Sequence, residues 1–167
     1  QLDSVTFDTK ATSEKFTLFI VGQANTSSNP STFFSKSGGW GTGATYAFGR
    51  LSNGSFAHRL QGVENASAGD GLMNVHTSQW NGTTHQYYYN GVARMHDTKN
   101  NVTDQSNNIT IGGTAGSNSG AGNYLNGAIH EVRVYQGELS DANRQLIENE
   151  LTDKWLSPKF PKRLTMS

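Results

Sequence analysis

The chain has 167 residues, no cysteine, and 13 lysine and arginine residues against 13 aspartate and glutamate residues, so its formal net charge is zero. This length suits one domain with one hydrophobic core, and the balanced charge excludes a strong overall field that would attract nucleic acid or an anionic membrane. The lack of cysteine excludes a disulfide framework, a thiolate zinc site and a cysteine nucleophile.

The N-terminal segment, QLDSVTFDTK, does not have the pattern of a signal peptide. No apolar run approaches the roughly 20 residues that cross a bilayer. We therefore expect a soluble module with no nucleic-acid partner and no insertion into membranes.

The first two thirds of the chain consist of short runs typical of strands. Residues 15–23, KFTLFIVGQ, form a continuous apolar run, which predicts a central strand covered on both faces. Turns rich in glycine, asparagine and serine separate the runs that follow: FFSKSG, TYAFGRL, SFAHRLQG, LMNVHTSQW, HQYYY, VARMH and NITIGG. This spacing predicts an all-β fold, a sandwich or a barrel.

Two Asn-Gly pairs, Asn81-Gly82 and Asn90-Gly91, predict tight hairpin turns because both residue types tolerate positive φ. If each pair is a two-residue loop, alternate side chains around it share a face. One face then holds His76, Trp80, His85, Tyr87, Tyr89, Arg94 and His96. The other face holds Val75, Thr77, Gln79, Thr84, Gln86, Tyr88, Ala93 and Met95.

The first of these faces has two interpretations. Its aromatic bulk indicates a core, whereas its three histidines and Arg94 indicate a polar groove. We interpret it as a core with polar ends. The opposite face would then expose Tyr88 together with Thr77, Gln79, Thr84 and Gln86, a mixture compatible with sugar binding.

A helix is predicted near the end of the chain. Ser140 suits its N-cap and Asp141 its first turn. The predicted packing stripe has helical spacing and consists of Ala142, Leu146, Ile147, Leu151 and Trp155. We expect one domain over residues 1–156, with the basic, proline-containing residues 157–167 as a tail or linker.

Five segments together resemble the laminin-G-like domains of the concanavalin A-like lectin and glucanase superfamily: FTLFIVGQ, FFSKSG, QWNGTTHQYYYNGV, ITIGG and, most specifically, YLNGAIHEVRVYQGELSDANRQLIENEL. The resemblance runs from about Phe7 to Trp155. It implies an antiparallel jelly-roll β-sandwich with one C-terminal helix. It also implies a monomeric, extracellular module of a larger bacterial protein that binds carbohydrate or protein, and for many relatives a structural calcium ion.

The chain departs from the family pattern in two places. Where the family strand often reads I-D-E-V, this chain has His130 before Glu131 and so loses one carboxylate. The family hairpin is usually aliphatic, whereas this one reads HQYYYNG. The second departure indicates either a locally repacked core or a ligand surface.

Glu131 has no second carboxylate at the spacing that glycoside hydrolysis requires. The superfamily's glucanases have their acids at alternate positions of one strand, whereas the neighbours of Glu131 on its predicted face are Ile129, Arg133 and Tyr135. The strand signatures of jelly-roll lyases are also absent. We therefore interpret Glu131 as structural, hydrogen-bonded to backbone or paired with an arginine, and the chain as not an enzyme.

Two aromatic residues in glycine-rich loops are candidates for stacking on sugar rings. Trp40 has glycine on both sides, and its ring either stands on a loop or closes one end of the sandwich. Tyr124 ends the loop TAGSNSGAGNY and either stacks on a ligand or packs at a strand start.

Further candidate ligand contacts lie in two other predicted strands. Arg50 and Arg59 are suited to an acidic or sulfated glycan through charge-assisted hydrogen bonds, or they belong to a solvated face. His58 and Arg59 are neighbours, so at most one of them faces a given groove.

The five histidines do not have zinc-site spacing. Calcium is the metal that the turn carboxylates suit, and the nearest candidate ligands are Asp70, Asp97 and Asp104.

The function that these features favour is a non-catalytic carbohydrate-binding module. It would bind a polysaccharide or oligosaccharide by aromatic stacking and polar contacts, attached to a larger polysaccharide-degrading or cell-surface protein. The alternatives are a protein-interaction or adhesion module of the same fold and an atypical polysaccharide lyase or hydrolase.

Overall fold

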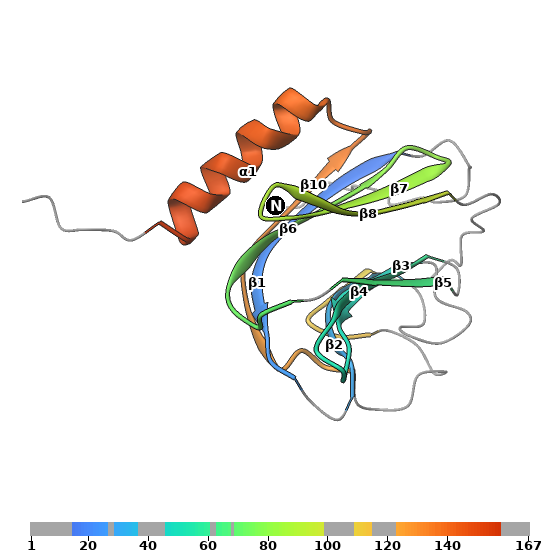
Figure 1. Cartoon of the computed structure of the whole chain (residues 1–167), viewed down its shortest axis with the longest axis vertical. Helices are drawn as coiled ribbons and strands as arrows, with labels where there is room; N and C mark the ends of the chain where they lie inside the picture. Colours follow the sequence, from blue (N-terminus) through green and yellow to red (C-terminus); the bar gives the residue numbers. More distant parts are fainter. Residues whose placement is uncertain are drawn as a thin grey trace, which may run out of the picture.

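Two antiparallel β-sheets face each other in the computed structural model, and helix α1 covers the outer side of one of them (Figure 1). The structure describes residues 15–26, 29–36, 46–60, 63–67, 69–98, 109–114 and 123–157. Its elements are β1 Phe16–Ala24, β2 Ser31–Lys36, β3 Tyr46–Arg50, β4 Phe56–Leu60, β5 Val63–Ser67, β6 Asn74–Trp80, β7 Thr84–Tyr89, β8 Val92–Thr98, β9 Ile109–Ile111, β10 Gly127–Gln136 and α1 Asp141–Trp155.

The first sheet has the strand order β10-β1-β6-β7-β8 and the second has the order β5-β4-β3-β2-β9. The predicted all-β sandwich with a C-terminal helix is confirmed at this level. The jelly-roll connectivity and the domain boundary at residue 156 stay predictions. No helix in the described ranges is long and apolar enough to cross a membrane.

Strand β1 is central and covered on both faces, as its apolar run predicts. It pairs with β6 on one side and β10 on the other. Leu18 and Ile20 point into the space between the sheets, whereas Phe19 and Val21 pack with Leu151 of α1. Burial on both faces explains why the sequence of this strand is continuously apolar.

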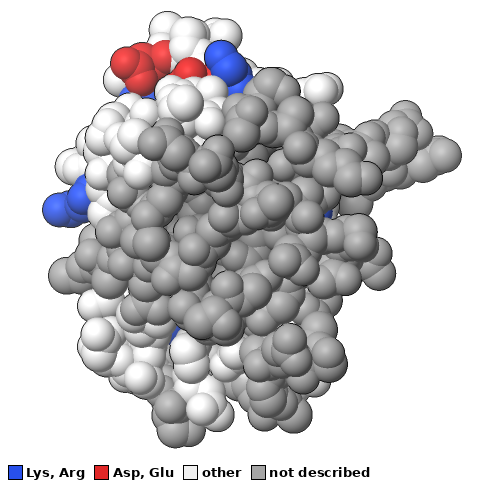
Figure 2. All heavy atoms as spheres, turned by 90° about the vertical axis from the view of Figure 1, so that its right-hand side faces the viewer, with Lys and Arg blue, Asp and Glu red and all other residues white. Residues whose placement is uncertain are grey.

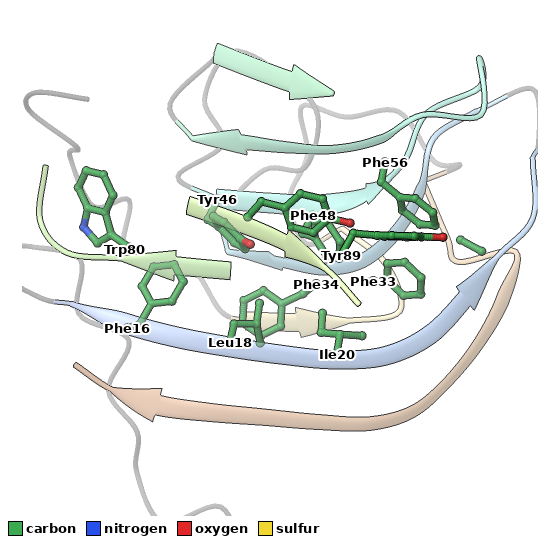
Figure 3. Packing of buried hydrophobic residues seen from close by; sticks show 12 residues of the cluster. Phe16, Leu18, Ile20, Phe33, Phe34, Tyr46, Phe48, Phe56, Trp80 and Tyr89 are labelled. Carbon is green, nitrogen blue, oxygen red and sulfur yellow. The ribbon is translucent and has the colours of Figure 1, made fainter. Parts of the chain in front are cut away.

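Aromatic rings from both sheets fill the space between them (Figure 3). Phe33 of β2 stacks on Phe48 of β3 and Phe56 of β4, with ring centroids 5.6 and 6.1 Å apart. His76 of β6 reaches across from the other sheet, its ring centroid 4.5 Å from that of Phe56. The hairpin face that holds His76 is therefore core, with Tyr87 fully buried.

The two Asn-Gly turns differ in length. Asn90 and Gly91 have φ of 50° and 76°, and they join Tyr89 to Val92 as the predicted two-residue loop. In the other turn Trp80 pairs with His85, so the loop has four residues, and the Asn81 Oδ1 accepts backbone hydrogen bonds from residues 83 and 84. The pairing of β6 with β7 is therefore shifted by two residues from the predicted one. Because side chains alternate with a period of two, the same side chains still share a face.

A β-bulge in β8 changes the facing of its second half. Tyr88 pairs with Ala93, but Tyr87 pairs with Met95, so Arg94 is the extra residue. Met95 consequently packs against the core, and His96 lies opposite Gln86 on the outer face. The predicted placement of Met95 outside and His96 inside is therefore wrong.

Helix α1 begins as predicted, with the Ser140 side chain accepting a hydrogen bond from the Asn143 N–H. The predicted stripe is confirmed in part, because Ile147, Leu151 and Trp155 pack in the cluster between the helix and the sheet. Arg144, Glu148 and Leu151 are buried, whereas Ala142 and Leu146 are exposed. The reason is that the helix packs on a partly polar sheet face.

Polar contacts join α1 to the sheet. The Thr77 hydroxyl donates to Glu148 Oε1 over 2.7 Å, and Arg144 Nη1 donates to Glu148 Oε2 over 2.6 Å. Gln79 Nε2 donates to the Leu139 carbonyl. Thr77 and Gln79 are therefore buried beneath the helix, and the prediction that they are exposed is wrong.

Three histidines lie in the core, where water cannot solvate an imidazolium. His58, His76 and His85 are all buried, and the rings of His58 and His85 are 4.2 Å apart. Burial lowers the pKa of His58 well below its usual range, with a further contribution from His85, and burial lowers the pKa of His76 to about 3.

We predict that the fold loses stability as the pH falls below the ordinary histidine pKa of about 6.5. Below that pH the unfolded chain binds protons that His58 and His76 do not bind in the folded state. The free energy of unfolding then falls by up to about 1.4 kcal/mol per pH unit for each residue. Urea denaturation at pH 8, 6.5 and 5 measures this slope.

The variant His58→Phe is expected to reduce the slope, because it removes a buried ring whose Nδ1 has no hydrogen-bond partner in the described structure. His96→Asn is the matched control, since it removes an exposed histidine of β8. An equal slope for His58→Phe and the unaltered protein would contradict the explanation.

Candidate functional site

A groove of about 370 Å³ lies on the outer face of β7 and β8. The described residues that line it are Gln86, Tyr88, Ala93, Arg94, Met95 and His96. Strand β8 is the last strand of its sheet in the described ranges. The groove therefore occupies the sheet margin.

The alternation of β7 places two side chains in the groove. His85 and Tyr87 point into the core, so Gln86 and Tyr88 point outward. The bulge at Arg94 brings His96 opposite Gln86, and Gln86 Nε2 lies 3.2 Å from His96 Nδ1. The bulge thus places His96 on the same face as Gln86 and Tyr88.

A hydrogen-bonded row runs along the groove. The Tyr88 hydroxyl donates to Gln86 Oε1, and the Gln86 amide in turn donates to His96 Nδ1. This arrangement fixes the orientation of the amide and leaves one of its two N–H groups for another acceptor. The row is therefore an ordered set of donors and acceptors at the surface.

Tyr88 contributes its edge and hydroxyl rather than a free ring face. The guanidinium of Arg144 lies 3.6 Å from the Tyr88 ring centroid, and the side chain is only 7% exposed. Arg144 is held there by Glu148 and by Asp141. The predicted exposure of Tyr88 is therefore wrong, although the residue does line the groove.

Burial raises the pKa of the Tyr88 hydroxyl above its usual value. The group therefore remains a protonated donor at neutral pH, and its hydrogen bond to Gln86 persists.

Tyr124 lies at a different edge of the molecule. It is 69% exposed, and a Cβ atom added to Gly113 would lie 3.3 Å from its ring. Gly113 follows β9, at the end of the second sheet, whereas β8 packs near β5 at the other end. Tyr124 is an exposed ring, but it is not part of the groove.

Arg50 and His58 lie inside the molecule. Arg50 donates to the Gly54 carbonyl over 2.9 Å and to the Ala24 carbonyl over 2.6 Å. His58 contacts the core rings of Phe48 and Tyr87. Both residues therefore have packing or hydrogen-bonding roles, and neither lines the groove.

Four of the predicted site residues are not among the side chains that the structure describes. Trp40 and Asp104 lie outside the described residues, as do the side chains of Arg59 and Asp97, whose backbones belong to β4 and β8. Their roles stay predictions.

Asp70 stabilises the turn before β6. Its Oδ1 accepts hydrogen bonds from the Leu72 N–H, the Asn74 amide and the Tyr89 hydroxyl, over 2.8 to 3.0 Å. Burial raises the pKa of Asp70, but these hydrogen bonds outweigh it and lower the pKa. Within the described ranges no cluster of three or more potential metal ligands occurs. A calcium site stays a prediction.

Glu131 joins β10 to the end of α1. Its Oε1 accepts from Arg133 Nε over 2.7 Å, and its Oε2 accepts from Lys154 over 2.9 Å and from Trp155 over 2.6 Å. The predicted pairing of Glu131 with an arginine is confirmed. A bulge opposite Val21 turns Ile129 into the core, so Ile129 does not share the face of Glu131.

The contacts of Glu131 determine its ionisation. Burial raises its pKa, but hydrogen bonds from Lys154, Trp155 and Arg133 lower it to about 2. A second carboxylate, Glu150 of α1, binds the same Arg133 over 2.8 Å, and Arg133 lowers its pKa too. Counting acids along the strand missed Glu150 because it comes from the helix.

Sequence reasoning also missed the groove residues Gln86, Arg94 and His96 as a group. The alternation of HQYYY does place Gln86 beside Tyr88 on the outer face. The bulge at Arg94 has no marker such as glycine in VARMH, so the facing of His96 could not be read from the pattern.

No protein-family model and no curated protein matched the sequence. Similar solved structures include a Trypanosoma rangeli sialidase in complex with 2,3-difluoro-KDN, with a TM-score of 0.64 and 13% identity over 87% of this chain and 24% of that chain. They also include a structure concerning the interaction of botulinum neurotoxin type C with two ganglioside molecules, with a TM-score of 0.61 and 15% identity over 83% of this chain and 36% of that one.

The binding domain of botulinum neurotoxin serotype D has a TM-score of 0.62 and 12% identity, over 89% of this chain and 38% of the other. This chain thus spans about a quarter to two fifths of the length of these structures. At such identities the similarity shows the fold alone, which is a two-sheet β-sandwich. The laminin-G-like assignment stays a prediction.

Proposed function

We propose that this chain is a non-catalytic carbohydrate-binding module and that the groove on β7 and β8 holds part of an oligosaccharide or polysaccharide. The observation that supports this most directly is the ordered row of Tyr88, Gln86 and His96 at an open surface. Sugar hydroxyls both donate and accept hydrogen bonds, and the fixed amide and imidazole match that requirement.

The dimensions of the groove agree with this role. Its volume of about 370 Å³ falls within the roughly 300–1,000 Å³ of small-molecule sites. The methyl group of Ala93 and the edge of the Tyr88 ring supply apolar surface for the C–H groups of a sugar ring. Polar and apolar contacts are therefore available side by side.

Two of the similar structures concern sugars. The sialidase is in complex with a difluorinated keto-deoxy-nononic acid, and the neurotoxin type C structure concerns an interaction with two ganglioside molecules. These ligands belong to those proteins. They support carbohydrate binding as a use of this architecture.

The ionisation of the carboxylates supports a non-catalytic role. A glycosidase general acid needs a raised pKa, so that it can donate a proton near neutral pH. The pKa of Glu131 is instead lowered to about 2, and the pKa of the neighbouring Glu150 is also lowered. Both carboxylates are occupied by Arg133.

The setting that we propose follows from the laminin-G resemblance. The chain would act outside the cell, as a monomeric module of a larger polysaccharide-degrading or cell-surface protein, with calcium as a structural ion. A protein-interaction or adhesion module is the second candidate function. The exposed Ile111 and Tyr124, at the edge far from the groove, favour it.

We predict that Gln86→Ala combined with His96→Ala lowers glycan affinity by about tenfold or more, because two hydrogen bonds of about 1 kcal/mol each are lost. Affinity electrophoresis on a panel of soluble polysaccharides, with and without calcium, measures the change. Leu146→Ala is the control, since Leu146 is exposed on α1. Tyr124→Ala and Trp40→Ala test the two loop candidates.

Failure of every polysaccharide to retain the unaltered protein, with and without calcium, would refute carbohydrate binding. Loss of retention in Tyr124→Ala, with full retention in the double variant, would move the site to the β9 edge.

We also predict that Glu131→Gln lowers the free energy of unfolding by about 1 to 2 kcal/mol at pH 7, because ionic contacts to Arg133 and Lys154 are lost. The contribution of Glu131 is present above an unfolded pKa of about 4.5 and is lost as the pH falls toward 2. Urea denaturation at pH 7, 4 and 2.5 should therefore show the two proteins converging in acid.

Glycan retention should be unchanged in Glu131→Gln, because β10 and β8 are at opposite ends of the sheet. Release of reducing ends by the unaltered protein, abolished in a folded Glu131→Gln variant, would show an enzyme instead.

A further inference from the structure

We infer that Arg144 of helix α1 is a positioning residue for the groove, because it holds the Tyr88 ring and thereby orients the Gln86 amide that the groove presents to a sugar. Arg144 is not among the described residues that line the groove. The inference rests on the proposed function, since it assigns a residue that acts on the same groove from the helix side.

The burial of Arg144 shows that it has partners inside the molecule. Its side chain is buried, whereas the apolar Ala142 and Leu146 on either side of it along the helix are exposed. A charged group is costly to bury unless it is paired and hydrogen-bonded. The helix therefore directs a cation, rather than the nearby apolar side chains, toward the sheet.

Two carboxylates fix the guanidinium of Arg144. Its Nη1 donates to Glu148 Oε2 over 2.6 Å, and its Nη2 donates to Asp141 Oδ1 over 3.3 Å. Glu148 is held in turn by the Thr77 hydroxyl, which donates to Glu148 Oε1 over 2.7 Å. Contacts within α1 and with β6 thus determine the position of this planar group.

The guanidinium lies on a face of the Tyr88 ring. The distance from Arg144 Cζ to the ring centroid is 3.6 Å, which is van der Waals contact. The ring quadrupole attracts a cation at its face, and the attraction is stronger where water is excluded. Tyr88 is almost fully buried. Its ring therefore cannot leave its rotamer without losing this contact.

The Tyr88 hydroxyl transmits the position of the ring to the groove. It donates to Gln86 Oε1, so the amide nitrogen of Gln86 faces His96 Nδ1 over 3.2 Å. Without this anchor the amide could exchange its oxygen and nitrogen or leave the row, and a ligand would then have to order it. Ordering the group before binding raises affinity without any contact to the ligand.

The same contact excludes one mode of sugar recognition. Because Arg144 occupies a face of the Tyr88 ring, a sugar cannot stack on that face. Removal of Arg144 would free it. Stacking as the main use of Tyr88 therefore predicts tighter binding without Arg144, whereas positioning of Gln86 predicts weaker binding.

A simpler use of Arg144 is to attach α1 to the sheet. Figure 2 shows acidic and basic side chains of the described residues together at the top, on the side where Figure 1 has α1. At the opposite edge of the sheet from β8, Arg133 of β10 binds Glu150 of the helix over 2.8 Å. An attachment role predicts that the loss of either pair lowers stability and leaves Gln86 unaffected.

The experiment removes each ion pair as a unit. Loss of Arg144 alone would leave Glu148 as a buried charge without its partner, which strongly destabilises a fold. The double variant Arg144→Met with Glu148→Gln removes both charges and keeps an amide oxygen as acceptor for the Thr77 hydroxyl. The matched control is Arg133→Met with Glu150→Gln, which removes a pair between strand and helix far from the groove. Urea denaturation checks that both are folded.

The first readout needs no ligand. The two N–H resonances of the Gln86 amide, identified by their loss in Gln86→Ala, report on whether this amide is held in place. In the Arg144 and Glu148 double variant we expect them to move toward the positions of a free glutamine, and in the control we expect no change. Unchanged Gln86 resonances in the first variant would overturn the inference.

The second readout is affinity for whichever of laminarin, xyloglucan, pectic galactan and alginate retains the unaltered protein most strongly in affinity electrophoresis. We expect the Arg144 and Glu148 double variant to bind about fivefold more weakly, as for the loss of one ordered hydrogen bond. In a Gln86→Ala background the same substitutions should have no further effect. The single variant Arg144→Lys should retain part of the affinity, because an ammonium group can still pair with Glu148 and face the ring.

Two affinity results would overturn the inference while leaving the proposed function intact. One is an equal loss of affinity with and without Gln86, which would show that the helix acts by another route. The other is tighter binding by the Arg144 and Glu148 double variant, which would show stacking on the uncovered Tyr88 ring. If none of the four polysaccharides retains the unaltered protein, the proposed function fails, and the Gln86 resonances alone decide whether Arg144 positions the amide.

Discussion

The packing of aromatic and histidine rings between the two sheets is the constraint on which the rest of the molecule depends. His76 and Tyr87 fix the faces of β6 and β7 because their rings must lie against Phe48 and Phe56. Once these rings point inward, alternation along β7 forces Gln86 to the outside. The polar row of the groove is thus a consequence of the strand register that packs the core. A shift of β7 by one residue would turn Tyr87 out of the core and Gln86 out of the groove.

A second, polar interface decides how much of the outer face stays open. Arg144 and Glu148 form a buried ion pair, and Glu148 also accepts a hydrogen bond from the Thr77 hydroxyl. Helix α1 therefore lies over β6 and the near side of β7. Buried pairs of this kind contribute more to a defined geometry than to net stability. The guanidinium of Arg144 covers the Tyr88 ring, so the helix forms one boundary of the groove and leaves β8 uncovered.

Periodicity and turn residues were sufficient to predict the antiparallel sandwich, the N-cap at Ser140 and the pairing of Glu131 with an arginine, because each depends on local patterns. Apolar spacing predicted the second half of the stripe on α1. It could not predict that Arg144 and Glu148 are buried, since the helix packs on Thr77 there. The facing of His96 depends on a bulge that no residue in the strand signals. The sequence therefore predicted the facing of groove residues on β7, where side chains alternate regularly, but not on β8, where the bulge interrupts the alternation.

A chain without net charge can still have regions that differ in charge, because the fold places particular acids beside particular bases. At the β10 end, the carboxylates of Glu131 and Glu150 form ion pairs with Arg133. Beneath the helix, Glu148 forms an ion pair with Arg144. At the β8 end Arg94 is among the described residues that line the groove. The formal net charge of zero is the sum over all of these regions. The charge that a ligand meets at any one place depends on which acids the fold places beside which bases there.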